Sequence, residues 1–515
     1  MHDARHSVQD YIDELPAWAD GTALGYPPMT AMQWRIWSLA AAGKFFEGFV
    51  VFMTGVALPL IAREFGIPAA YSGFVSAATL FGILVGALGL GGLADYFGRK
   101  RMFVVEMIIF VAFLALLMVS NNALAVVISL FGLGLALGCD YPIAHLIISE
   151  NIPTATRGRL VLGAFAFQAV GALTGTLIGF LVLRYSPTLD AWRWMFATAF
   201  IPALAVMAGR FSITESAHWL LNRGEVIRAE HAVARLLVRQ PQYPTIVSLK
   251  QRAQHLVEHA RSAHIGRLFA RGHNLQATIL ASVPWFLQDL STYGIGIFTP
   301  TLLAVALGAP PAHVRTTADI IATDLLAAKG SAFITLWLIA GIAAAVVLTD
   351  RVGRIKLQVA GFIGCALGLF LASLSTGFAG ETRIGLIFAG FMLFDFMTNA
   401  GPNAQTYLLA GEVFPTEIRA MGAGFAASFA KIGAVLTAFL FPILLTSIGT
   451  RALLSWLIGA SLLGAIVTWL FRIETAGVRI DHIGVAVAPA GENDREAAGP
   501  ERLYAARRKP ETTGG

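Results

Sequence analysis

Long apolar segments recur along almost the whole chain and constrain its fold more than any other feature. Each is about twenty residues long, which is the length that a helix needs to cross roughly 30 Å of hydrocarbon. We count about twelve of them between residues 37 and 471. Only 13% of the 515 residues are charged, against roughly 25% in soluble domains. The sequence therefore predicts an all-helical membrane protein and excludes an ordinary soluble enzyme.

The predicted spans form two groups of six, separated by a polar stretch. The spans lie near residues 37–62, 71–94, 102–119, 122–148, 160–184 and 194–212, then 275–304, 331–349, 355–376, 383–409, 419–446 and 451–471. They predict a first bundle over residues 37–213, a linker over 214–274 and a second bundle over 275–472. Residues 1–36 precede the first span. Residues 473–515 contain few apolar residues and are expected to be disordered.

Lysine and arginine indicate how the chain crosses the membrane. They gather in the connections that follow spans two, four, six, eight and ten. Because such loops favour the cytoplasmic side, both termini and the linker are expected in the cytoplasm, with the spans in the plasma membrane, or in the inner membrane if the protein is bacterial. The net charge of +6 is assigned to lipid headgroups, and no nucleic-acid partner is expected.

Other classes of function find little support in the residues. Cys139 and Cys365 both lie in apolar spans, so no disulfide framework or thiolate metal site is expected. His255 and His259 are spaced like metal ligands, but a solvated helix face explains them better. No glycine-lysine loop that would cradle ATP is present in the sequence. We therefore expect no enzyme, metal or cofactor, and a monomer.

A short motif occurs at the same place in each half. The segment GLADYFGRKR at residues 92–101 follows the second span, and LTDRVGRIK at 348–356 follows the eighth. Each combines an acid, a glycine turn and an arginine: Asp95 with Arg99, and Asp350 with Arg354. The halves are therefore interpreted as duplicates, and these four residues as part of a gate.

A second repeated pattern lies at the ends of spans four and ten. Glu150 precedes Arg157 by seven residues, and Glu412 precedes Arg419 by the same spacing. We interpret these residues as gating salt bridges that break as two halves rock against each other.

Six ionisable residues stand out inside the predicted spans. Each costs roughly 2.5 to 3.5 kcal/mol near the bilayer centre, so such residues mark functional sites. They are Lys44, Glu47, Asp140, Asp289, Asp395 and Lys431. Lys44 and Glu47 are three residues apart and share one helical face. Together the six predict a polar cavity between the halves.

The segments around these charges resemble a known family. They are GCDYPIAHLIISE at 138–150, WFLQDLSTYG at 285–294, Gly-Pro-Asn at 401–403, GEVFPTEIR at 411–419 and KIGA at 431–434. They are similar to the proton-coupled phosphate symporters, a branch of the major facilitator superfamily close to the sugar porters. The resemblance implies twelve transmembrane helices in two pseudo-symmetric six-helix bundles. It also implies proton-coupled symport of a small anion, most often inorganic phosphate, by alternating access.

The resemblance also implies roles for single residues. Positions that match the substrate cavity of that branch are Tyr141, Gln168, Trp285, Asp289, Tyr293 and Asn403, and Lys431 matches its cation. Glu47, Asp140 and Asp289 are the candidate proton carriers, since a carboxylate in a low-dielectric cavity binds a proton readily unless a cation opposes it. We expect Lys431 to be the main anion-sensing residue, with Lys44 auxiliary because Glu47 neutralises it locally.

Departures from that pattern leave alternatives open. The branch carries two acids in span one, whereas this chain has Glu47 alone and adds Lys44. Cys139 replaces a glycine, and Asp395 is an additional acid. A small organic acid or a sugar is therefore an alternative substrate. A non-transporting substrate sensor on a transporter fold is an alternative of another class.

Overall fold

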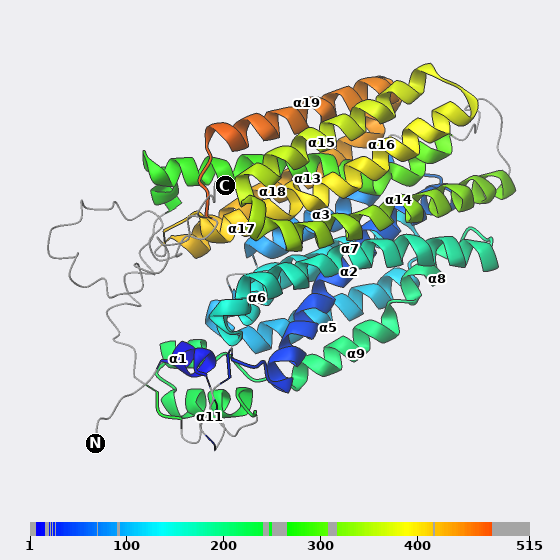
Figure 1. Ribbon diagram of the computed structural model, residues 1–515. Helices are drawn as coiled ribbons and strands as arrows, with labels where there is room; N and C mark the ends of the chain where they lie inside the picture. Colours follow the sequence, from blue (N-terminus) through cyan, green and yellow to red (C-terminus); the bar gives the residue numbers. More distant parts are fainter. Residues whose placement is uncertain are drawn as a thin grey trace, which may run out of the picture.

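The computed structural model is built almost entirely of helices (Figure 1). It describes residues 7–15, 20, 22, 24–25, 27–68, 71–89, 93–239, 247–249, 265–306, 317–415 and 418–475. Within those residues, 11 helical segments are long and apolar enough to cross a membrane. The long helix α13 (His273–Ala306) makes the twelfth; Gln288, Asp289 and other polar residues make it less apolar. The predicted twelve-helix membrane fold is confirmed.

The first six spans form the N-terminal half. They are α2 (Ala31–Glu64), α3 (Ser72–Gly89), α5 (Arg99–Met118), α6 (Ala123–Asn151), α7 (Thr154–Tyr185), and α8 (Ala191–Ala197) with α9 (Phe200–Phe211). Helix α2 begins at Ala31, earlier than the predicted start at residue 37, because Thr30 caps it with a side-chain hydrogen bond from the backbone N–H of Gln33.

The last six spans form the C-terminal half. They are α13, α14 (Thr317–Val352), α15 (Arg354–Leu374), α16 (Gly380–Ala400) with α17 (Pro402–Glu412), α18 (Arg419–Ser447) and α19 (Gly449–Leu470). The tenth span was predicted to be continuous over 383–409, but it is broken at Gly401. Pro402, at the first position of α17, has no backbone N–H to continue the α16 hydrogen-bond pattern.

Short elements gather at one end of the two halves, which we call the linker face. Here lie α1 (Val8–Asp13), α4 (Leu93–Phe97), α10 (Ala217–Asn222), α11 (Val226–Leu236) and the 3-10 helix η2 (Ile265–Phe269). Figure 1 shows α1, α11 and α17 at this end. Glu474 and Thr475, which the sequence placed in a disordered tail, instead contact the start of α15 and the end of α17. Most of the predicted tail, residues 476–515, lies outside the described residues.

Glycines allow the helices of the N-terminal half to pack backbone to backbone. A Cβ at Gly171 of α7 would overlap the carbonyl oxygen of Phe45 in α2. A Cβ at Gly48 of α2 would likewise overlap the carbonyl oxygen of Gln168 in α7. Small residues permit this close approach in lipid. The contact fixes the rotation of α2, and therefore the direction in which its charged residues point.

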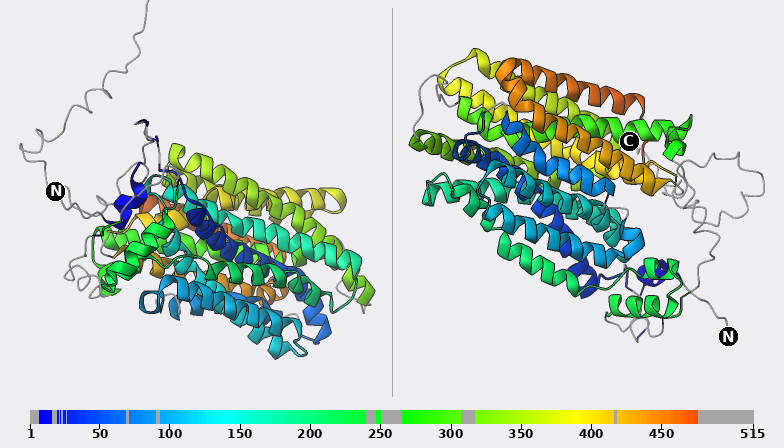
Figure 2. Two further views of the ribbon diagram at one scale, coloured as in Figure 1. Left: turned by 90° about the horizontal axis from the view of Figure 1, so that it is seen from below. Right: turned by 180° about the vertical axis from the view of Figure 1, so that it is seen from behind.

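The two halves contact each other along helices from both repeats, as the views in Figures 1 and 2 show for α7 beside α14 and α3 beside α18. Away from the linker face, Gly55 of α2 packs against the carbonyl of Ile297 in α13. At the linker face, the ring of Phe165 in α7 stacks on Tyr407 of α17, with 4.6 Å between centroids. Polar side chains therefore lie buried between these two contact regions.

Candidate substrate and proton site

Two lysines and two carboxylates form a buried cluster between the halves, which we call the central cluster: Lys44, Glu47, Asp289 and Lys431. Each of the four is at most 4% exposed. Lys44 Nζ lies 3.0 Å from Glu47 Oε2, as expected for residues three apart in α2. The Lys44 ammonium also lies 3.3 Å from the centre of the Tyr141 ring in α6, a favourable cation–π contact.

Lys431 of α18 connects the rest of the cluster. Its Nζ lies 3.0 Å from Asp289 Oδ2 in α13 and 3.8 Å from Glu47 Oε1 in α2. The charges therefore alternate from Lys44 through Glu47 and Lys431 to Asp289, and the pair with Glu47 crosses between the halves. With both acids ionised, the cluster has no net charge.

Neutral polar side chains complete this network. The Tyr293 hydroxyl donates to Glu47 Oε1 at 3.1 Å and accepts from Lys431 Nζ at 2.9 Å. Gln168 Nε2 lies 3.1 Å from Glu47 Oε1 and 3.2 Å from the Tyr293 hydroxyl oxygen. The structure therefore brings together residues from α2, α7, α13 and α18 that lie up to 384 positions apart in the chain (47 to 431).

Aromatic rings close the cluster toward the linker face. Tyr407 of α17 lies with its ring centre 5.7 Å from that of Tyr141 and 6.2 Å from that of Trp285. All three rings are less than 10% exposed. An aromatic wall of this kind excludes water and presents hydroxyl and indole donors to a polar ligand.

Two residues of the predicted cavity lie outside this network. Asn403 Nδ2 donates to Asn399 Oδ1 at 2.6 Å, so Asn403 bonds to α16 rather than to the cluster. Asp395 is buried in α16 close to Cys365 of α15. The break at Gly401 separates α17, which carries Asn403, from α16.

Asp140 belongs to a different buried group, the arginine cluster, made of Glu106, Asp140 and Arg210. Asp140 Oδ1 accepts from Arg210 Nη2 at 2.8 Å, and Arg210 Nη1 pairs with Glu106 Oε1. The Arg210 guanidinium also lies 3.5 Å from the centre of the Phe103 ring. Asp140 fits against α2 because Gly43 has no Cβ to overlap its carboxylate.

The sequence interpretation missed both partners of Asp140. Glu106 lies inside the predicted third span, so its position among apolar residues was a sufficient signal. Arg210 lies two residues before the predicted end of the sixth span, where an arginine usually extends to the membrane surface. Instead it is 0% exposed. Asp324 of α14, at 4% exposed, is a further buried acid outside the predicted set.

The repeated loops form matching networks at the linker face. Gly98 and Gly353 adopt positive φ angles of 111° and 95° immediately before α5 and α15, a conformation that favours glycine. The arginine that follows each glycine pairs with an acid at the end of a neighbouring span. Arg99 lies 3.4 Å from Glu150, and Arg354 lies 3.3 Å from Glu412.

Two further acids repeat this symmetry. Glu215 accepts from the backbone N–H of Lys100 at 2.9 Å, and Glu474 accepts from that of Arg354 at 3.0 Å. Each acid therefore covers the N-terminus of a spanning helix, where backbone N–H groups carry partial positive charge.

The pairing expected at seven-residue spacing is wrong. Glu150 pairs with Arg99, while Arg157 hydrogen-bonds to Thr154 at 3.3 Å. Glu412 likewise pairs with Arg354, while Arg419 donates to the carbonyl oxygen of Phe414 at 3.1 Å.

Asp350 and Asp95 complete the predicted gate. The Asp350 carboxylate lies 2.9 Å from Arg354 and 3.9 Å from Arg159 of the other half. Asp95 lies in α4, and its side chain is outside the described residues.

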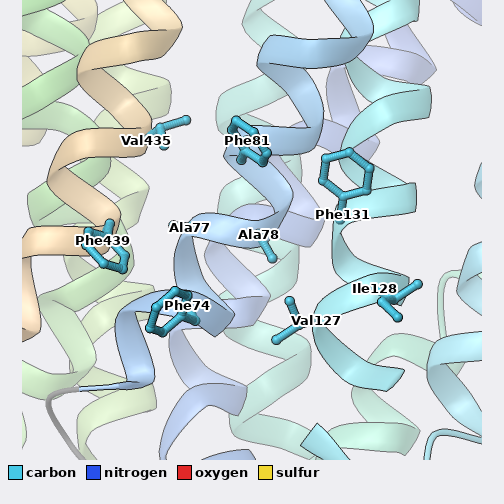
Figure 3. A pocket seen from close by; sticks show the side chains of 9 residues that line it. All are labelled: Phe74, Ala77, Ala78, Phe81, Val127, Ile128, Phe131, Val435 and Phe439. Carbon is cyan, nitrogen blue, oxygen red and sulfur yellow. The ribbon is translucent and has the colours of Figure 1, made fainter. Parts of the chain in front are cut away.

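A separate pocket of about 310 Å³ lies between α3, α6 and α18 (Figure 3). Its walls are apolar and include Phe74, Phe131 and Phe439. Without a polar donor or a charge in its lining, this pocket does not suit an anion.

Known proteins resemble the chain over most of its length. The family model described as "Sugar (and other) transporter" matches residues 37–486. The Escherichia coli inner membrane metabolite transport protein YgcS is 28% identical over 87% of this chain and 93% of its own. The Oryza sativa inorganic phosphate transporter 1-1 is 26% identical over 90% of this chain and 95% of its own.

Solved structures resemble the fold. The proton:xylose symporter XylE, in complex with 6-bromo-6-deoxy-D-glucose, superposes with a TM-score of 0.70 at 20% identity, covering 88% of this chain and 98% of that one. The chain has the fold of this major facilitator superfamily structure, and it belongs to the sugar (and other) transporter family.

Proposed function

We propose that the protein couples the entry of a proton to that of a small anion, with inorganic phosphate as the first candidate. The observation that carries this proposal is the charge balance of the central cluster. Two ammonium groups face two carboxylates, so the cluster is neutral when both acids are ionised. A proton on Asp289 leaves a net charge of +1 beside Lys431. A monovalent anion then restores neutrality in a site that excludes water.

This order of events gives coupling. Lys431 is engaged by Asp289 at 3.0 Å, so an ionised Asp289 competes with any anion for the same ammonium. Protonation removes the competitor and raises anion affinity, and by linkage the anion raises proton affinity equally. Tyr293 and Gln168 supply hydroxyl and amide donors, and a carboxylate accepts the O–H of a partly protonated phosphate.

The arginine cluster supports a second proton site. Its two carboxylates share one guanidinium, and Asp140 Oδ2 and Glu106 Oε2 have no hydrogen-bond partner within the described residues. Two ionised acids beside Arg210 leave a net charge of −1, whereas one bound proton makes the group neutral. Asp140 also lies beside Gly43, one residue before Lys44. Protonation of the arginine cluster would therefore change the electrostatic potential at Lys44 and so at the central cluster.

A small organic acid is the second candidate substrate. Lys44 makes the cavity more positive than the phosphate-symporter pattern, and the rings of Tyr141, Trp285 and Tyr407 offer an apolar wall. The similarity to one relative named a phosphate transporter and to another named a metabolite transport protein supports both candidates.

In alternating access, the contacts between the halves would open at one end of the molecule while they close at the other. The linker-face pairs Arg99–Glu150 and Arg354–Glu412, and the Asp350–Arg159 pair between halves, are the proposed gate. We place the linker face in the cytoplasm because lysine and arginine gather in its loops.

The test uses proteoliposomes that contain a pH-sensitive dye. Purified protein should take up labelled phosphate together with protons, and an inward proton gradient should accelerate uptake. Asp289→Asn should strongly reduce substrate-dependent proton uptake. The matched control Asp395→Asn changes another buried aspartate outside the cluster and should preserve it. Phosphate uptake without proton movement would indicate a uniporter, and uptake of carboxylates instead would favour the organic acid.

A further inference from the structure

A basic pocket opens at the linker face, between the start of α5, the end of α9 and helix α11. Its volume is about 650 Å³. The residues that line it come from the ends of two spanning helices and from the linker, and they do not include the central cluster, the arginine cluster or the residues of the gate. Neither the transport cycle nor the fold accounts for it.

Positive charge dominates this pocket. Lys100 and Arg101 come from the first turn of α5, and Arg228, His231 and Arg235 come from α11. The three α11 residues are spaced three and four apart, so they share one helical face. The one acid in the lining, Glu215, already accepts hydrogen bonds from the backbone N–H groups of Lys100 and Ser216.

The arginines of α11 retain the capacity to bind an anion. Arg228 pairs with Glu225, but its side chain is 64% exposed. Arg235 donates to the carbonyl oxygen of Ser212 at 3.3 Å, and it repels Lys100 across the pocket. An anion between these side chains would relieve that repulsion.

An unpaired hydroxyl points to a ligand independently of the charges. Thr214 lines the pocket and is 8% exposed, and its Oγ1 has no hydrogen-bond partner within the described residues. A buried hydroxyl without a partner is unfavourable. Rotation of the Thr214 side chain toward the pocket would let a phosphate oxygen accept its hydrogen bond.

The outer wall of the pocket is apolar and belongs to the membrane-spanning helices. Val105 of α5 is 42% exposed and Phe211 at the end of α9 is 56% exposed. A soluble anion would leave these apolar side chains uncovered, whereas the acyl chains of a lipid would cover them. We propose that the pocket binds an anionic phospholipid, with its phosphate among the basic residues and its acyl chains along α5 and α9. Basic pockets beside spanning helices suit such headgroups.

Native mass spectrometry of the full-length protein in mild detergent tests this. The probes are phosphatidylglycerol, phosphatidylethanolamine and inorganic phosphate. The double variant R228Q/R235Q removes two charges from the pocket. The control R271Q/R351Q removes two exposed arginines of the linker face outside it, and R228K/R235K keeps the pocket charge.

The protein should retain one phosphatidylglycerol more tightly than phosphatidylethanolamine. Each lost charge should weaken binding about fivefold, so R228Q/R235Q should weaken this binding on the order of 30-fold. R228K/R235K and R271Q/R351Q should bind almost as the unmodified protein does. Equal loss in the control, equal retention of the two lipids, or displacement of phosphatidylglycerol by millimolar inorganic phosphate would overturn the lipid assignment.

Discussion

Replacing Lys431 by glutamine should remove most anion binding, because its ammonium is the one shared by both acids of the central cluster. Lys431 Nζ lies 3.0 Å from Asp289 and 3.8 Å from Glu47. A monovalent anion about 4 Å from this charge gains about 4 kcal/mol at an effective dielectric constant of about 20. The glutamine amide can still donate a hydrogen bond, worth about 1 kcal/mol. The net loss is about 3 kcal/mol, or a rise in Kd on the order of 100-fold.

Lys44→Gln should be milder. Lys44 is held by Glu47 at 3.0 Å and by the Tyr141 ring at 3.3 Å, so its charge is already offset locally. Without Lys44, Glu47 interacts more strongly with Lys431 and competes with the anion for that ammonium. We expect a loss of about 1 kcal/mol, which corresponds to less than about a tenfold rise in Kd.

Calorimetric titration of the purified protein with phosphate, at mildly acidic pH where Asp289 can hold a proton, measures both constants. Removing one partner of a buried ion pair can cost about 3 to 5 kcal/mol of stability. Each variant must therefore show a thermal unfolding transition before titration. Lys431→Arg keeps the charge and should retain binding to a greater degree than Lys431→Gln. A larger loss of binding in Lys44→Gln than in Lys431→Gln would contradict this assignment, because the anion would then lie against α2.

Three further predictions concern other parts of the molecule. Asp289→Asn imitates the protonated acid, so its anion Kd should vary little with pH, as calorimetry at several pH values would show; a pH dependence like that of the unmodified protein would contradict this. Glu106→Gln should reduce the proton uptake that accompanies each anion in dye-loaded proteoliposomes, and unchanged uptake would remove the arginine cluster from coupling. Gly171→Ala should lower Tm by several degrees because its Cβ would overlap the α2 backbone, whereas Gly158→Ala in the same helix, with nothing within 4 Å, should not. Equal Tm values for the two alanine variants would show that the contact between α2 and α7 accommodates an added methyl group.

Local patterns in the sequence were sufficient for the membrane fold and for one ion pair. Apolar length is a property of each segment alone, so the twelve spans and their division into halves follow without tertiary contacts. The Lys44–Glu47 pair was also predictable, since residues three apart on a helix are neighbours. The duplicated loops carry their glycine and arginine in the chain itself, and Gly98 and Gly353 adopt the same backbone conformation in both halves.

Only the tertiary structure decided which charges meet across helices. Helix rotation depends on backbone contacts between distant segments, such as Gly171 against Phe45, and no single span contains that information. The sequence therefore placed Asp140 in the cavity without Arg210, and it paired Glu150 with Arg157 rather than with Arg99. The same packing set Lys431 beside both Asp289 and Glu47, which share no sequence neighbourhood. A buried charge requires a partner wherever packing provides one, and the fold determines which partner that is.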